Sequence, residues 1–344
     1  MAIRKLNKKG LFLTFISIAI VAAMIAIFTP SNISLEKDIS AVKARVENVD
    51  DYVFDLENIY LKDTLNAIGR RTIIALTEYM KAETIRTGTE VFLTDFDAAF
   101  SEVLLYGTIG GTNIDDFYAG EIMTDNTYNY YLNNITKAAE KAFNVQTEFD
   151  PYPLNANFIG VHQINPWFVS AEVNISFTVS TAEGTASWKR NVTVTTDIAV
   201  EGFKDPYYLV KTNGDYENII NRTGTKFNEW DADKVKDFIR NGNYTHFQSS
   251  NAPNFLSRFV DDASASICCG IESMVNPNNP AISNKDVSYA DYRYWSDTAN
   301  CANPVRSLFR VNEINAEFPN FKFDFDHLAK YKLTADEQIC PPPS

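Results

Sequence analysis

The stretch VSAEVNISFTVSTAEGTASWKRNVTVTTDIAV (residues 169–200) decides the fold class of this chain. Apolar residues occupy every second position from Val169 to Val179, and they recur at even positions between Trp188 and Val200. Alternation with a period of two predicts strands that have one buried and one exposed face. The short Gly-containing segment between the two runs predicts a turn, so we expect a long antiparallel hairpin.

Helical spacing dominates the chain before this hairpin. Between residues 35 and 60, apolar side chains recur at alternating spacings of four and three, at Leu35, Ile39, Val42, Val46, Val49, Val53, Leu56 and Tyr60. A period of 3.5 residues predicts a helix with a coiled-coil seam, about 40 Å long. Two interpretations remain open. The helix associates with a second copy through residues 35–60, or it lays its apolar stripe along its own ectodomain.

The patterns divide the chain into consecutive regions. We expect a helical stalk over 31–86, a further helical region over 87–149 with helices near 94–106 and 127–143, and an antiparallel sheet over 150–203. Residues 204–344 are mixed in pattern and contain all the cysteines. The predicted fold class is therefore α+β, with an ectodomain that follows an N-terminal membrane segment.

Residues 11–28 contain no charged side chain. A helix of this length matches a hydrocarbon core of about 30 Å, and the run is longer than the apolar core of an export signal. Arg4, Lys5, Lys8 and Lys9 precede the run without any acidic residue. We therefore predict a basic cytoplasmic segment over residues 1–10 and a transmembrane helix over 11–29 that contacts the lipid bilayer through 11–28. The ectodomain would lie outside the cell membrane.

The junction Lys8-Lys9-Gly10 followed by Leu11-Phe12-Leu13-Thr14 resembles the class III (prepilin-like) signal of archaeal type IV pilins and related surface proteins. The resemblance implies that a membrane peptidase cuts after Gly10, that Leu11 becomes the mature N-terminus, and that the apolar helix packs into a filament. Phe15 departs from the family, because many pilins carry Glu at that position. An uncut anchor is the alternative. Two later stretches, EGFKDPYYLV (201–210) and ICCGIESMV (267–275), look similar to archaeal membrane-anchored surface proteins of unknown function.

Four cysteines, Cys268, Cys269, Cys301 and Cys340, lie in the predicted outer region. An even number of cysteines outside the cell predicts disulfides. A bond between the neighbours Cys268 and Cys269 would need a strained backbone, so we expect each to join one of Cys301 and Cys340. A zinc site is the rival interpretation, but the chain has no C-x-x-C motif and no histidine near these cysteines in sequence.

Charge and motifs restrict the classes of function. The net charge of −13 argues against nucleic acid as a partner, because nucleic-acid binding needs a basic surface. Asp324, Asp326 and His327 form the densest polar set, and we interpret them as a helix start in which one aspartate is the cap. No hydrolase or metalloprotease motif is present. We expect no catalytic residue, no cofactor and no metal.

Clustered aromatic residues offer a second kind of site. The stretch YADYRYW (289–295) places Tyr289, Tyr292, Tyr294 and Trp295 among polar neighbours. If these rings are exposed, they could stack on a glycan or on a protein ligand. If they are buried, they belong to the core.

Three functional hypotheses follow from these features. The leading one is a membrane-anchored extracytoplasmic structural protein, pilin-like or part of a surface appendage. The alternative is a membrane-tethered binding module or adhesin that uses the exposed aromatics. An extracytoplasmic hydrolase has the least support.

Overall fold

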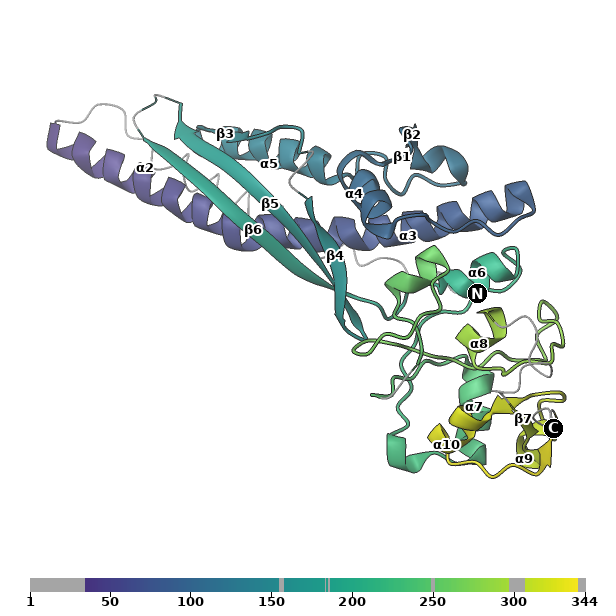
Figure 1. Ribbon diagram of the computed structural model, residues 1–344. Coiled ribbons are helices and arrows are strands. Elements are labelled where there is room, and N and C mark those ends of the chain that lie inside the picture. Colours follow the sequence, from purple (N-terminus) through teal and green to yellow (C-terminus); the bar gives the residue numbers. More distant parts are fainter. Residues whose placement is uncertain are drawn as a thin grey trace, which may run out of the picture.

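The computed structural model describes residues 35–154, 158–182, 184, 186–248, 251–296 and 307–339. Over these residues the expected α+β class with an antiparallel sheet is confirmed (Figure 1). The predicted membrane span 11–28, together with Gly10 and Leu11, lies outside the described residues. Within the described residues, no helix has the length and apolar character needed to cross a membrane.

One long helical rod forms the N-terminal part of the described chain. Helix α2 (Leu35–Asp55) passes through a π-helical turn (Leu56–Tyr60) into α3 (Leu61–Thr87). The rod runs along the whole sheet in Figure 1. It ends at Gly88, which has a φ of 67° and donates its backbone N–H to the carbonyl of Thr84. A left-handed glycine is a common helix stop, because it carries no Cβ to clash.

Two shorter helices, α4 (Phe96–Tyr106) and α5 (Tyr128–Phe143), confirm the helices expected near 94–106 and 127–143. Both begin at a side-chain cap. Asp95 accepts a hydrogen bond from the backbone N–H of Ala98, and the hydroxyl of Thr127 accepts one from Tyr130. Caps of this kind satisfy amide groups that have no partner inside the helix. The connection contains the short strands β1 (Thr108–Ile109) and β2 (Thr112–Asn113) and a 3-10 turn (Ile114–Phe117).

The expected hairpin is confirmed as β5 (Phe168–Thr181) and β6 (Ser187–Ala199). These strands pair from Phe168–Ala199 to Ser180–Ser187. On the other edge of β5, β4 (Phe158–Asn165) pairs with its first half and β3 (Val145–Phe149) with its last residues. The odd-numbered side chains of β5 from 169 to 179 are buried, as the alternation predicts.

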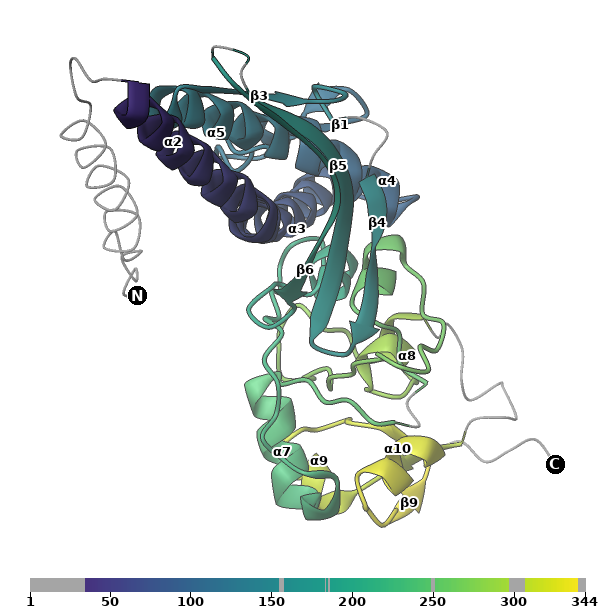
Figure 2. The same cartoon turned by 90° about the vertical axis from the view of Figure 1, so that its left-hand side faces the viewer.

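The helices pack on the sheet from one side (Figure 2). Asn66 on α3 donates hydrogen bonds to the hydroxyl of Thr196 at 3.1 Å and to the carbonyl of Asp197 at 2.8 Å. Near the hairpin tip, Tyr52 of α2 stacks on Phe143 of α5, with 5.1 Å between ring centroids. The long helix is therefore fixed to the sheet by polar contacts and to α5 by an aromatic contact.

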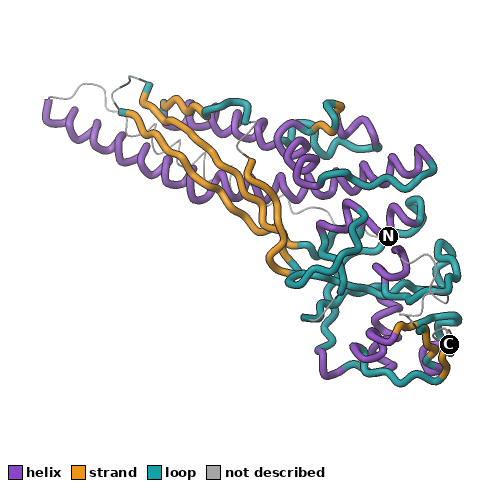
Figure 3. The backbone as a smooth tube through the Cα atoms, in the orientation of Figure 1, coloured by secondary structure: helices purple, strands orange, loops and turns teal. Residues whose placement is uncertain are grey.

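The described C-terminal part consists of short elements and the loops between them. They are α6 (Pro206–Lys211), a 3-10 turn (Phe227–Glu229), α7 (Ala232–Asn241), a 3-10 turn (Leu256–Val260), α8 (Asp291–Ser296), β7 (Leu308–Arg310), α9 (Asn312–Asn315), β8 (Phe323–Asp324), α10 (Phe325–Lys330) and β9 (Glu337–Gln338). The last three strands form a small sheet in the order β8-β7-β9. Figure 3 shows that loops dominate this part, whereas long helices and strands form the other. A single hydrophobic core nevertheless runs from Val49 to Tyr331 and joins both parts.

Candidate functional site

The apolar seam of α2 is divided between two environments. Val49, Val53 and Leu56 are buried in the core, with exposures of 3%, 2% and 0%. Val42 and Val46 occupy the same stripe two turns and one turn earlier, yet they are 55% and 38% exposed. The expectation that this helix packs on its own ectodomain therefore applies to its second half. Val42 and Val46 present the same stripe to solvent.

The surroundings of Val42 and Val46 are exposed as well. Every residue from 42 to 48 is exposed, and the described partners of this stretch include the i,i+4 ion pair of Lys43 and Glu47 at 3.9 Å. A polar contact with the sheet follows at Asp50, which accepts a hydrogen bond from the indole of Trp188 at 3.2 Å. The start of α2 is thus an amphipathic helix with charged flanks, which is typical of a coiled-coil position.

The disulfide expectation is corrected in its pairing. The structure joins Cys268 to Cys269, whereas we expected each to join one of Cys301 and Cys340. Both sulfur atoms lie against the carbonyl oxygen of Gln163 in β4, at 3.6 and 3.3 Å. The chain turns at residues 267–269, where the two adjacent cysteines form their disulfide. The spacing of the cysteines in the sequence does not predict that turn. Cys301 and Cys340 lie outside the described residues.

The expected aromatic platform at 289–295 is also corrected. Tyr289, Tyr292 and Tyr294 are buried, with exposures of 0%, 2% and 0%, and Trp295 is half-buried. Tyr294 packs on both Tyr289 and Trp295, with ring centroids 5.1 and 4.5 Å apart. The rings belong to the core, because the segment runs beneath the C-terminal loops.

Asp324 caps α10, as the interpretation of the polar set predicts. Its carboxylate accepts a hydrogen bond from the backbone N–H of His327 at 2.9 Å and lies 2.7 Å from the imidazole Nδ1. The other ring nitrogen lies 3.6 Å from Glu272, which also receives hydrogen bonds from Lys330 and Tyr331. Asp326, in contrast, is exposed.

These contacts shift the pKa values of the cluster in opposite directions. Burial alone would lower the pKa of His327, but the carboxylates of Asp324 and Glu272 outweigh it and raise the pKa to about 9. Burial alone would raise the pKa of Glu272, but His327 and Lys330 lower it to about 2. Since His327 and Glu272 have no solvent exposure, the cluster holds the C-terminal elements together and offers no surface for a substrate.

A second buried cluster surrounds Arg258, which has no solvent exposure. Its guanidinium donates to Asp205 at 2.5 Å, to Asp291 at 2.8 Å and to the carbonyl of Ile271 at 2.5 Å. Tyr244 adds a hydrogen bond to Asp205 at 2.6 Å. Burial raises the pKa of the Asp291 carboxyl in spite of the neighbouring cation. The cluster links α6, the 256–260 turn and α8 inside the core.

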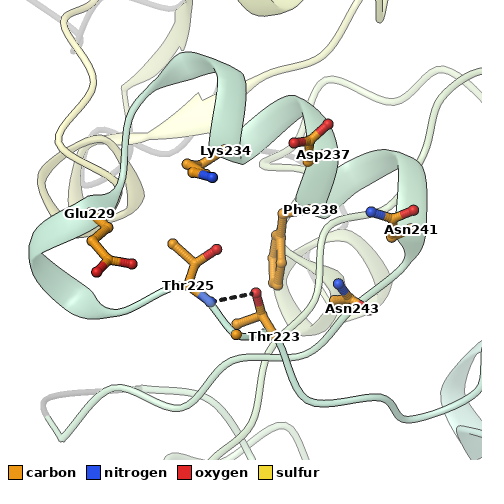
Figure 4. Close-up of a pocket in the computed structure, with 9 residues that line it drawn as sticks. Thr223, Thr225, Glu229, Lys234, Asp237, Phe238, Asn241 and Asn243 are labelled. Atoms are coloured by element: carbon orange, nitrogen blue, oxygen red, sulfur yellow. Dashed lines mark hydrogen bonds between the residues drawn. The ribbon is translucent and has the colours of Figure 1, made fainter.

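Two hollows on the surface share the segment 223–225. The smaller, of about 300 Å³, lies beside α7 and is lined by Thr223, Gly224, Thr225, Glu229, Lys234, Asp237, Phe238, Asn241 and Asn243 (Figure 4). The larger, of about 550 Å³, is lined by Trp167, Glu201, Arg222, Thr223, Gly224, Thr225, Lys226, Thr245 and His246. Volumes of about 300–1,000 Å³ are typical of small-molecule sites, and the larger hollow falls well inside that range. The smaller hollow is lined by one continuous stretch, 223–243, whereas the larger hollow combines separate segments that no sequence motif relates.

Metal-ligating residues do not gather in the part of the chain that the structure describes: it has no group of three or more His, Cys, Asp or Glu side chains arranged to hold an ion.

Comparison with protein-family models, with curated proteins and with solved structures finds no match to this chain. The fold defines an α+β protein in which a long amphipathic helix packs on an antiparallel sheet and projects an apolar stripe beyond it.

Proposed function

We propose that this chain is a membrane-anchored extracytoplasmic structural protein, a pilin-like or surface-appendage component. Its N-terminus would lie inside the cell, residues 11–28 would cross the bilayer, and the α+β ectodomain would lie outside. The charge pattern of the first ten residues supports this orientation. The disulfide between Cys268 and Cys269 supports an oxidising compartment for the ectodomain.

The exposure of Val42 and Val46 on the α2 seam is the observation that carries the proposal. Val49, Val53 and Leu56 are buried in the core of the chain itself, but the same stripe continues to Val42 and Val46, which are exposed. Exposed apolar stripes on helices mark contacts with partners. We infer that the partner is the same stripe of a second copy, because the 3.5-residue period is complementary to itself.

Identifying the N-terminal residue of the mature chain tests whether the protein is cleaved after Gly10 and whether it stays anchored in the membrane. We expect mass spectrometry of material sheared from cells to find a chain that begins at Leu11, because Gly10 would precede the bond that a prepilin-type peptidase cuts. The membrane fraction of the same cells is the control for unassembled protein. A chain that keeps residues 1–10 and stays entirely in the membrane fraction would refute the appendage role and leave a plain anchor.

Cysteine cross-linking tests the self-association. In membranes that contain the full chain, we expect Val42→Cys and Val46→Cys to form disulfide-linked dimers, because parallel seams bring equal positions together. Lys43→Cys and Glu47→Cys are matched controls, since they are one residue further along the same exposed turns but lie off the stripe. Dimers are read on a non-reducing gel.

The comparison among the four variants decides the outcome. Strong cross-linking at the two valine positions, with little at the two controls, supports the seam. Equal cross-linking at all four positions would indicate random collision in the membrane. No cross-linking at any of them would rule out a second copy on this face.

A further inference from the structure

We propose that the larger hollow, lined in part by Trp167, Arg222, Lys226 and His246, binds a small carboxylate-bearing saccharide of about one or two sugar rings. This site goes beyond the structural role proposed above and does not depend on it. The hollow has a volume of about 550 Å³, within the range of about 300–1,000 Å³ typical of small-molecule sites.

Four parts of the chain meet at this hollow. Trp167 lies in the turn between β4 and β5, and Glu201 directly follows β6. The segment 222–226 crosses one side, and Thr245 and His246 come from a neighbouring loop. The hollow therefore sits where the long sheet meets the loop-rich C-terminal part. Junctions between structural layers are common places for ligand sites.

Arg222 provides the principal anchoring group. Its guanidinium carbon lies 5.2 Å from the centroid of the Trp167 ring. Stacking on an aromatic ring holds the plane of the guanidinium while leaving its N–H edge available. Within the described residues, the Arg222 side chain has no carboxylate partner, whereas Lys204 and Lys211 each contact two carboxylates. A planar N–H fork of this kind suits a carboxylate, which it can bind through two parallel hydrogen bonds.

His246 supplies a second directed polar group. Its Nδ1 lies 2.7 Å from the carbonyl oxygen of Gly270, and because a carbonyl can only accept, Nδ1 carries the proton. The other nitrogen, Nε2, then remains for a ligand. Gly270 follows the Cys268–Cys269 disulfide, whose sulfurs rest on the carbonyl of Gln163 in β4. This anchoring holds the loop that orients His246 before any ligand arrives.

The remaining lining groups indicate the rest of the ligand. Lys226 adds a second cation, which favours an anion in a chain whose net charge is −13. Glu201 and Thr225 can accept hydrogen bonds from hydroxyl groups. One carboxylate accompanied by several hydroxyls matches this set, and an acidic sugar carries both.

The test compares D-glucuronate with D-glucose, which differ by the carboxylate. With the full chain in detergent micelles, saturation-transfer NMR should show saturable binding of millimolar glucuronate and much weaker binding of glucose. Arg222→Ala should weaken glucuronate binding by roughly tenfold or more, because a charge-assisted pair is lost. Arg222→Lys keeps the charge without the fork and should also bind more weakly than the native chain.

Controls separate this site from non-specific effects. Arg190→Ala removes a surface arginine of β6, whose Nε lies 3.8 Å from Glu57, and should leave glucuronate binding unchanged. Arg222 is exposed, so both of its variants should unfold at the native temperature. The proposal is overturned if glucuronate does not saturate, if Arg222→Ala binds it as well as the native chain, or if glucose or inorganic phosphate binds equally well.

Discussion

Replacing Arg258 by alanine should destabilise the fold by about 3–5 kcal/mol, because it leaves the carboxylates of Asp205 and Asp291 buried without their cation. Asp205, Asp291 and Arg258 all have no side-chain exposure, so water cannot replace the lost contacts. The free energy of unfolding, measured by denaturant titration followed by tryptophan fluorescence, gives the size of the effect.

Arg240→Ala is the matched control for this prediction. Arg240 also contacts two carboxylates, those of Asp237 and Glu317, each at 2.5 Å, but its side chain is 51% exposed. Exposed ion pairs of this kind contribute at most about 1 kcal/mol. If the two alanine variants lose the same free energy, burial is not the reason for the importance of Arg258.

Stability should depend on pH through the cluster of His327, Asp324 and Glu272. The pKa of His327 is raised to about 9 in the fold from an ordinary 6.5, so its contribution is complete below pH 6.5 and is lost as the pH rises to 9. The pKa of Glu272 is lowered to about 2 from 4.5, so its contribution is complete above pH 4.5 and is lost as the pH falls toward 2. Both contributions are therefore complete between about pH 4.5 and 6.5.

We expect the free energy of unfolding to fall by a few kcal/mol between pH 6.5 and 9, since a tenfold change in proton affinity corresponds to about 1.4 kcal/mol. Lys330, Tyr292 and Tyr331 also face this cluster. Burial raises the pKa of both tyrosine hydroxyls, so the tyrosines do not ionise in this pH range. Thermal unfolding across the pH range is the measurement.

Two variants test whether His327 causes the decline in the free energy of unfolding between pH 6.5 and 9. His327→Ala should be less stable throughout and should lose the decline between pH 6.5 and 9. His162→Gln, which replaces an exposed imidazole on β4, should keep it. A decline that survives in His327→Ala would have to come from another group.

Local patterns allowed several features to be predicted from sequence. The β5–β6 hairpin follows from alternation, because side chains of a strand point to opposite faces whatever surrounds them. The starts of α4 and α5, and the cap at Asp324, follow from residues that satisfy the first amides of a helix. These features depend on neighbours within a few positions, which the sequence displays directly.

Features that depend on distant contacts could not be predicted in this way. Polar neighbours suggested that the rings of Tyr289 and Tyr292 are exposed, but loops that are remote in sequence cover them. The larger hollow combines Trp167, Arg222 and His246, which no motif relates. The buried partners of Arg258 are likewise 53 and 33 positions away.

The long helix has one feature that follows from the sequence and another that only the tertiary structure decides. By itself, the sequence determined that residues 35–60 form an amphipathic helix with an apolar stripe, because a 3.5-residue period is a local property. Only the tertiary structure decided that Val49 and Val53 are covered while Val42 and Val46 are exposed. The physical reason is that burial depends on where the sheet ends beneath the helix, and that boundary is set by strands more than a hundred residues further along the chain.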